Sequence, residues 1–167
     1  GDQNYSKELN LSKRTGVSSF NNFNLDHQWI KTRSKEYKTD VLGFLDGKQL
    51  VNVKTLDEYC EKKSIDKIDI LKIDTQGYED KVLLGAKNLL KENRIKLIEL
   101  ELIFSEIYEK PLQIYDVEKN LAPNNYKLFG ISNNGSLISN YIFQSDLIYI
   151  SNDTYENFKS KSPYFNN

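Results

Sequence analysis

Two carboxylates flank a short polar turn in the segment Asp74-Thr75-Gln76-Gly77-Tyr78-Glu79. Acids at this spacing can steer a cationic ligand, orient a hydroxyl nucleophile or hold a divalent cation. Gly77 permits close approach of the backbone to a neighbour, because glycine has no side chain. The alternative is structural: Asp74 caps the helix that follows, and Glu79 stabilises the first helical turn through the helix dipole. The spacing leaves both interpretations open.

A second pair of acids, Glu99 and Glu101, lies within an otherwise mostly apolar segment. Because side chains alternate along a strand, these two carboxylates share one face. An unpaired buried carboxylate is costly, so the pair either meets a basic partner or lines a polar cleft. Glu101 is the better candidate for a cleft, since it lies nearer the end of the strand, with Glu106 and Tyr108 just beyond.

The other reactive residue types form no catalytic or metal-binding pattern. His27 is the single histidine and is expected at the surface. Cys60 falls on the apolar stripe of a helix and is expected in the core rather than as a nucleophile. The sequence contains no recognisable Ser-His-Asp or Cys-His arrangement and no His/Cys spacing typical of zinc sites. Hydrolase and metalloprotein functions are therefore disfavoured, and no metal site is predicted.

A strand, helix, strand succession must position these acids. Residues 68–73 are mostly apolar and predict a strand covered on both faces that ends just before Asp74. Apolar residues at helical spacing follow from Gly77 to about Asn93, and residues 95–103 predict the next strand. This order implies a right-handed parallel crossover. Ligands bind beyond the carboxyl ends of parallel strands, where Asp74 is expected.

The segments before this unit predict a peripheral β ribbon and a short helix. Hydrophobic alternation over residues 5–11 and 49–53 suits half-buried strands, and Asp46-Gly47 predicts a hairpin turn. The sequence Thr55-Leu56-Asp57-Glu58 has the pattern of a capping box and predicts a helix over residues 56–62.

The segments after this unit predict one further helix and three short strands. Pro111 is expected to be the first residue of the helix, and Pro123 to close it. Strands are predicted over residues 126–131, 137–143 and 146–150, with a turn at 133–135. Residues 151–167 are polar and are expected to form a frayed tail.

The composition indicates one folded domain over residues 1–167, since 38% hydrophobic residues, 11 Tyr and 8 Phe exceed what a disordered chain carries. Lys and Arg total 23 against 24 for Asp and Glu, so no nucleic-acid partner is expected. No apolar run approaches the roughly 20 residues of a membrane-spanning helix. A single cysteine and the lack of a leader pattern favour a cytoplasmic location.

Six segments follow one another in an informative order: Val53-Lys54-Thr55-Leu56-Asp57, Leu71-Lys72-Ile73-Asp74-Thr75-Gln76-Gly77-Tyr78-Glu79, Val82-Leu83-Leu84-Gly85-Ala86, Glu99-Leu100-Glu101 with Tyr108, Tyr126-Lys127-Leu128-Phe129, and Asp146-Leu147-Ile148-Tyr149. Their succession resembles the carboxy-terminal part of S-adenosylmethionine-dependent methyltransferases of the FkbM family. The resemblance covers about the last two thirds of the chain, and its most specific element is Lys-Ile-Asp-x-x-Gly-x-Glu followed by Val-Leu-x-Gly-Ala.

The resemblance implies an α/β protein with a partial Rossmann-like class I methyltransferase fold. The second half of that sheet is expected, with parallel strands and an antiparallel last strand, together with an amino-terminal β ribbon. The implied reaction is methyl transfer from S-adenosylmethionine to an oxygen of a sugar, polyketide or lipid-like acceptor, so the expected partner is a small molecule or a glycan.

The resemblance also implies roles for particular residues. Asp74, with Thr75 and Gln76, is expected to contact the cofactor, and Asp74 closes the cofactor site near the reacting methyl group. Asp74 and Glu79 are expected to be catalytic. Glu101 and Tyr108 are expected to bind the acceptor, and Glu79 helps to position it.

The chain contains no Gly-x-Gly motif, and Gly1-Asp2 resembles the turn after the third strand of the family. We therefore expect a carboxy-terminal fragment that lacks the Gly-rich cofactor loop and is inactive alone. The strand over residues 68–73 would then expose an apolar edge, which favours self-association. A non-catalytic α/β scaffold or degenerate module of a larger protein is the alternative function. A carboxylate-lined divalent-cation enzyme is a third hypothesis.

Overall fold

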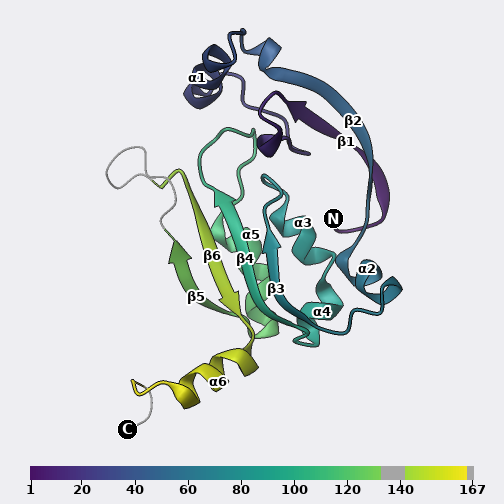
Figure 1. The fold of residues 1–167 in the computed structure, drawn as a ribbon, viewed down its shortest axis with the longest axis vertical. Coiled ribbons are helices and arrows are strands. Elements are labelled where there is room, and N and C mark those ends of the chain that lie inside the picture. The colour runs from purple at the N-terminus through teal and green to yellow at the C-terminus, as the bar shows by residue number, and fades with distance from the viewer. Residues whose placement is uncertain (133–141, 165–167) are drawn as a thin grey trace.

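The structure, a computed structural model, describes residues 1–132 and 142–164 of the 167-residue chain. Its strands form two separate sheets (Figure 1). A ribbon pairs β1 (Tyr5–Ser12) with β2 (Leu45–Val53) in antiparallel orientation. The main sheet has the strand order β3-β4-β6-β5. Its strands are β3 (Ile68–Ile73), β4 (Ile95–Ile103), β5 (Lys127–Ser132) and β6 (Gln144–Ile150).

Helices and short 3-10 turns connect these strands. The described part of the chain contains η1 (Thr15–Val17), α1 (Gln28–Glu36), η2 (Leu42–Phe44), α2 (Leu56–Lys62), α3 (Glu79–Leu84), α4 (Lys87–Lys91), α5 (Ile114–Leu121), η3 (Ala122–Asn124) and α6 (Asn152–Lys161). Figure 1 shows α1 and the ribbon above the carboxyl ends of β3 and β4, away from α4 and α6.

The main sheet confirms the predicted mixture of strand directions. β3 and β4 pair in parallel, with Lys72 opposite Glu99. β6 runs antiparallel to both of its neighbours, β4 and β5. The chain is thus an α/β protein whose main sheet contains a parallel pair and an antiparallel last strand.

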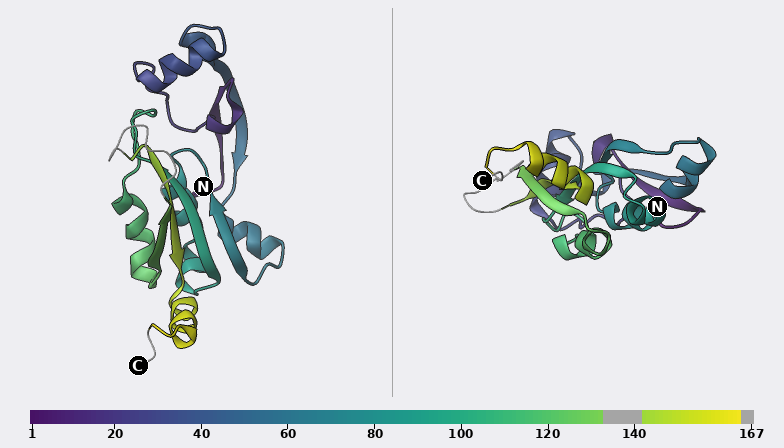
Figure 2. Two further views of the ribbon diagram at one scale, coloured as in Figure 1. Left: turned by 60° about the vertical axis from the view of Figure 1, so that its left-hand side comes forward. Right: turned by 90° about the horizontal axis from the view of Figure 1, so that it is seen from below.

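The two faces of the main sheet differ in chemistry. Ile98, Leu100 and Leu102 of β4 are fully buried. They share one core with apolar residues of α3, α4 and α5, and α5 covers this side in Figure 2. Glu99 and Glu101 alternate with them and point to the opposite face. Because side chains alternate along the strand, the two acids lie on the face of the sheet opposite these helices.

β3 lies at one edge of the main sheet as described. Its Ile73 is only 2% exposed and contributes to the core, whereas Ile70 is 66% exposed. The prediction of a strand covered on both faces is therefore wrong, and the predicted exposed apolar edge is confirmed. The apolar residues of β3 therefore predicted burial correctly only for the face of the sheet that the helices cover.

The amino-terminal ribbon is confirmed, but the predicted hairpin turn at Asp46-Gly47 is wrong. Both residues lie within β2, where the register places them opposite the single residue Leu11 as a β-bulge. Gly47 has a φ of +89°, which this bulge requires and which glycine adopts without strain. The two strands are instead joined by the long crossing over residues 13–44, which contains α1.

The helix α2 is confirmed, with half of its predicted capping box. The Thr55 hydroxyl accepts a hydrogen bond from the Glu58 N–H at 3.2 Å. The Thr55 N–H donates to the Asn4 side chain at 3.0 Å rather than to Glu58. Cys60 is 1% exposed, as expected for a core residue.

The predicted helix between Gly77 and Asn93 is interrupted, giving α3 and α4 with a break at Gly85-Ala86. A Cβ on Gly85 would lie 1.9 Å from the Gly1 carbonyl oxygen, so the chain passes too closely here for a side chain. The Asp57 carboxylate accepts the N–H groups of Asn88 at 2.9 Å and Leu89 at 3.1 Å, which caps α4. The spacing of apolar residues alone could not predict a helix cap that comes from a residue distant in the sequence.

Two predictions near the carboxyl end are wrong. The last long helix before β5 begins at Ile114 rather than at Pro111, because Gln113 and Asp116 form a reciprocal capping box there. The expected frayed tail is the helix α6, which Ser151 caps.

An edge-on contact between Phe158 of α6 and Phe129 of β5, with ring centroids 5.0 Å apart, holds α6. The strands predicted over residues 126–131 and 146–150 are β5 and β6. The turn predicted at 133–135 and most of the strand predicted over 137–143 lie outside the described residues.

Candidate functional site

A cavity of about 370 Å³ opens where the carboxyl ends of β3 and β4 meet the segment around η1 and α1. Its lining includes the predicted site residues Asp74, Gln76 and Glu101. The rest of the lining comes from Arg14, Gly16, Val17, Trp29, Arg33, Ile103, Ile107, Phe143 and Gln144. The site thus forms at the expected edge of the parallel pair.

The loop after β3 has an unusual backbone that Glu79 holds in place. Gln76 and Gly77 have φ values of +57° and +91°. The positive φ of Gly77 favours glycine, and a Cβ there would also lie 2.6 Å from the Asn21 side-chain nitrogen, which would have to move. The Glu79 carboxylate accepts the Thr75 N–H at 2.9 Å, the Thr75 hydroxyl at 3.0 Å and the Gly77 N–H at 3.0 Å.

Glu79 is only 1% exposed, and this burial raises the pKa of its carboxyl group above the usual value for glutamate. Hydrogen bonds from the loop partly offset the effect of burial. Glu79 therefore lies beneath the loop rather than on the cavity wall.

Gln76 links the acids that face the cavity. Its side-chain nitrogen donates to Asp74 Oδ1 at 2.7 Å and to Glu101 Oε2 at 3.2 Å. The Tyr108 hydroxyl lies 3.0 Å from Gln76 Oε1 and 2.9 Å from the Val17 carbonyl oxygen. Tyr108 is 1% exposed, so it contacts the cavity through Gln76. The structure thus brings Asp74, Gln76 and Glu101 together, with Tyr108 behind them.

Glu99 and Glu101 have different surroundings, although they share one face of β4. Glu99 meets a basic partner, since the Lys72 ammonium lies 2.8 Å from its carboxylate. Glu101 lines the cavity, where Gln144 donates to its Oε1 at 2.6 Å. Partial burial, followed by the charges of Asp74 and Asp146, raises the pKa of Glu101 above the usual range.

A cationic and aromatic wall faces these groups, and the sequence analysis missed it. The guanidinium carbons of Arg14 and Arg33 lie 5.7 and 5.4 Å from the centroid of the Trp29 ring. Trp29 and Arg33 are four residues apart on α1, which places them on one helical face. That spacing was the only local signal, because Arg14 reaches the wall from a separate segment before η1.

Comparison with protein families bears on this site. The family model for the methyltransferase FkbM domain matches residues 1–128. The chain belongs to this family. The match runs from the ribbon through the start of β5 and includes the whole loop between Asp74 and Glu79. No curated protein and no solved structure matches the chain significantly. The family indicates a methyltransferase.

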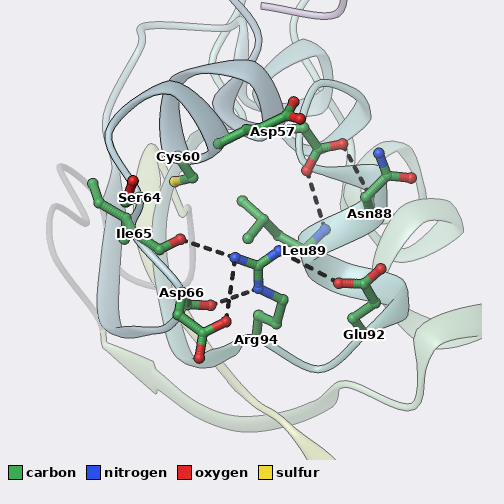
Figure 3. A pocket seen from close by; sticks show the side chains of 10 residues that line it. Asp57, Cys60, Ser64, Ile65, Asp66, Asn88, Leu89, Glu92 and Arg94 are labelled. Atoms are coloured by element: carbon green, nitrogen blue, oxygen red, sulfur yellow. Dashed lines mark hydrogen bonds and ion pairs between the residues drawn. The ribbon is translucent and has the colours of Figure 1, made fainter.

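The FkbM domain contains a second cavity, of about 440 Å³, at the opposite end of β3 and β4 (Figure 3). Arg94 lies at its centre and donates to the carbonyl oxygens of Ile65 at 2.9 Å and Asp66 at 2.5 Å. Its guanidinium also contacts the Glu92 carboxylate at 3.4 Å. Because these partners already engage Arg94, its guanidinium connects the segments around the cavity and is not a free polar group for a ligand.

Two further sequence predictions concern His27 and metal binding. His27 is partly buried rather than openly exposed, because its Nδ1 accepts the Trp29 N–H at 3.2 Å and caps α1 of the FkbM domain. Its Nε2 lies 3.1 Å from the Ser105 hydroxyl. Within residues 1–132 and 142–164, no group of three or more His, Cys, Asp or Glu residues could hold a metal ion. No helix in these ranges is long and apolar enough to cross a membrane.

Proposed function

We propose that this FkbM-family chain transfers a methyl group from S-adenosylmethionine to a hydroxyl oxygen of a small-molecule or glycan acceptor. The reaction would take place at the cavity lined by Asp74, Gln76 and Glu101. The strand order β3-β4-β6-β5, with its one reversed strand, supports a partial Rossmann-like class I methyltransferase fold. The observation that carries the proposal is the convergence of two carboxylates on a cavity at the carboxyl edge of a parallel pair.

The residues of this cavity suit the reacting end of the methyl donor. When bound, S-adenosylmethionine supplies a methyl group carried on a positively charged sulfur. Asp74 is exposed at the end of β3, and Glu101 lies beside it through Gln76. Their negative charges favour a cation at this wall. We assign Asp74 and Gln76 to the cofactor side of the cavity, and Thr75, which does not line it, supports their loop through its two bonds to Glu79.

The other residues orient the acceptor and manage its proton. The raised pKa of Glu101 brings its carboxyl group closer to the range in which a general base works near neutral pH. Gln144 and Gln76 fix the two Glu101 oxygens, so the carboxylate is held in one orientation. Tyr108 acts through Gln76, and Glu79 acts by holding the loop that carries Asp74 and Gln76. Such positioning is a main source of rate in a displacement reaction.

Because the 167 residues are expected to be inactive alone, the test is methyl transfer by the chain in full-length context, with labelled S-adenosylmethionine and a panel of hydroxyl-bearing acceptors. Asp74→Asn keeps the shape of the side chain and removes its charge, and we expect a loss of kcat/KM of at least about 100-fold. Asp69→Asn is the matched control, because Asp69 is an exposed acid on the same strand that pairs with Lys96 at 2.6 Å. Ordinary kinetics in Asp74→Asn would rule out the assigned role.

One observation favours a second candidate, a non-catalytic α/β module. None of the glycines in the 167 residues forms a Gly-x-Gly motif, the usual loop for a dinucleotide-like cofactor. Calorimetric titration of S-adenosylmethionine against the chain in full-length context separates the two candidates. Saturable binding that Asp74→Asn weakens supports the enzyme, and its absence at millimolar concentration supports the module.

A further inference from the structure

The cavity has walls of opposite charge. Asp74 and Glu101 contribute the acidic wall at the ends of the strands, and Arg14 and Arg33 contribute the basic wall from the segment around η1 and α1. Figure 1 shows α1 above those strand ends. Two walls of opposite charge orient a ligand that carries both a hydroxyl group and an anion.

Trp29 fixes the basic wall. Its ring lies under the guanidinium groups of both arginines, at 5.7 Å for Arg14 and 5.4 Å for Arg33. The ring is itself packed against Phe44 and Phe143, with centroids 6.4 Å apart in each case. The two cations are therefore gathered on one aromatic platform, which offsets part of their mutual repulsion.

The donors of this wall are not saturated. Arg33 Nη1 contacts both oxygens of Glu36, at 2.6 and 2.7 Å. Arg33 Nε is buried and has no hydrogen-bond partner among the described residues. The Arg14 guanidinium makes no hydrogen bond or ion pair within that same part of the chain, and Arg14 is exposed. Each guanidinium carries five N–H donors, so the exposed Arg14 group and the Nη2 of Arg33, rather than its buried Nε, retain capacity for an anion with several oxygens.

We infer that the methyl acceptor carries an anionic group, a carboxylate or a phosphate, which binds Arg14 and Arg33 while the acceptor hydroxyl faces Asp74 and Glu101. The inference rests on the proposed function. The acidic wall repels the anion, so the acceptor binds in one orientation. A cavity of about 370 Å³ is large enough for a compact ligand. The substrate class is a hydroxyl-bearing acid, such as a uronic acid or a sugar phosphate.

Calorimetric titration of the 167-residue chain with four probes tests the inference without any methyl donor. The probes are D-glucuronate, D-glucose 1-phosphate, neutral D-glucose and inorganic phosphate. We expect at least one charged sugar to bind about tenfold or more tightly than glucose, and more tightly than inorganic phosphate. The two charged sugars distinguish a carboxylate from a phosphate as the preferred anion.

Variants assign the preference to the arginines. Arg14→Gln and Arg33→Gln should each reduce it by about tenfold. Lys13→Gln is the control for general charge, because exposed Lys13 lies beside Arg14 but does not line the cavity; it should leave the preference unchanged. Glu36→Gln removes the negative charge that engages Arg33 and should tighten binding of the charged sugar about threefold. Thermal melting checks that each variant is folded.

Three results would overturn the inference: equal binding of glucose and the charged sugars, a preference that survives both arginine substitutions, or inorganic phosphate binding as tightly as glucose 1-phosphate. The proposed function fails separately. An anion-selective chain that never transfers methyl groups would contradict the enzyme alone. Methyl transfer that requires Asp74 but uses only neutral acceptors would contradict this inference alone.

Discussion

The Glu79 carboxylate holds the loop of the candidate site, and its removal should have a measurable cost. In Glu79→Ala, three donors lose their acceptor: the Thr75 N–H, the Thr75 hydroxyl and the Gly77 N–H. A buried donor without a partner costs about 1–3 kcal/mol. Because Thr75 and Gly77 are only partly buried, water can replace part of each bond, and the lower end of that range applies. We therefore expect a loss of about 3 kcal/mol in the free energy of unfolding.

For a chain of this length, that loss corresponds to a fall in Tm of about 6–12 °C. Urea denaturation followed by circular dichroism measures the loss in the free energy of unfolding. Glu79→Gln retains one acceptor oxygen, so it should keep the Thr75 bonds and the 3.3 Å bond from the Gly77 N–H to Oε1, lose the 3.0 Å bond to Oε2 and cost about 1–2 kcal/mol. Glu61→Ala is the control, since this exposed glutamate makes no hydrogen bond or ion pair through its side chain in the described chain, and it should change stability by less than about 0.5 kcal/mol. If Glu79→Ala behaves like Glu61→Ala, the carboxylate does not hold the loop.

Three other predictions concern the elements around the site. Burial lowers the pKa of His27, so its capping of α1 contributes stability above the unfolded pKa of about 6.5, and this stability is lost as pH falls below that value. The variant His27→Asn caps without titrating, so its unfolding midpoint should exceed that of the unsubstituted chain increasingly from pH 7 to 5. Parallel pH curves for the two proteins would contradict the cap. Asp57→Ala should lower the free energy of unfolding by about 1–2 kcal/mol in urea denaturation, because two N–H groups of α4 lose their cap. An unchanged free energy of unfolding would mean that Asp57 does not stabilise the start of α4. Ile70→Lys should reduce self-association in analytical ultracentrifugation at unchanged stability, because Ile70 is 66% exposed on the edge strand β3; a monomeric unsubstituted chain at high concentration would refute this.

Local signals account for most of the correct fold predictions. β3 and β4 were predicted because an apolar run and strict alternation are properties of a few consecutive residues. Several wrong predictions came from positions where a distant segment contributes to the outcome. The chain breaks between α3 and α4 at Gly85, where Gly1 leaves no room for a side chain, and α6 forms where Phe158 packs on Phe129. No window of the sequence contains both partners of such a contact.

The candidate site divides in the same way. The sequence singled out Asp74 because it follows a predicted parallel strand, and Glu101 because two acids share one face of a strand near its end; both line the cavity. It could not distinguish the surroundings of Glu99 from those of Glu101, since the difference lies in the Lys72 ammonium on the neighbouring strand. The catalytic and binding roles of Asp74 and Glu101 stay predictions.

The sequence by itself determined the strand, polar turn and helix around Asp74 and Glu79, because backbone propensity, alternation and turn chemistry act over neighbouring residues. It also carried the pattern that places the chain in the FkbM family. Only the tertiary structure decided what faces that loop. The long crossing between β1 and β2 brings Arg14 and Trp29 over the strand ends. Their approach depends on packing between segments far apart in the chain, which no local pattern encodes.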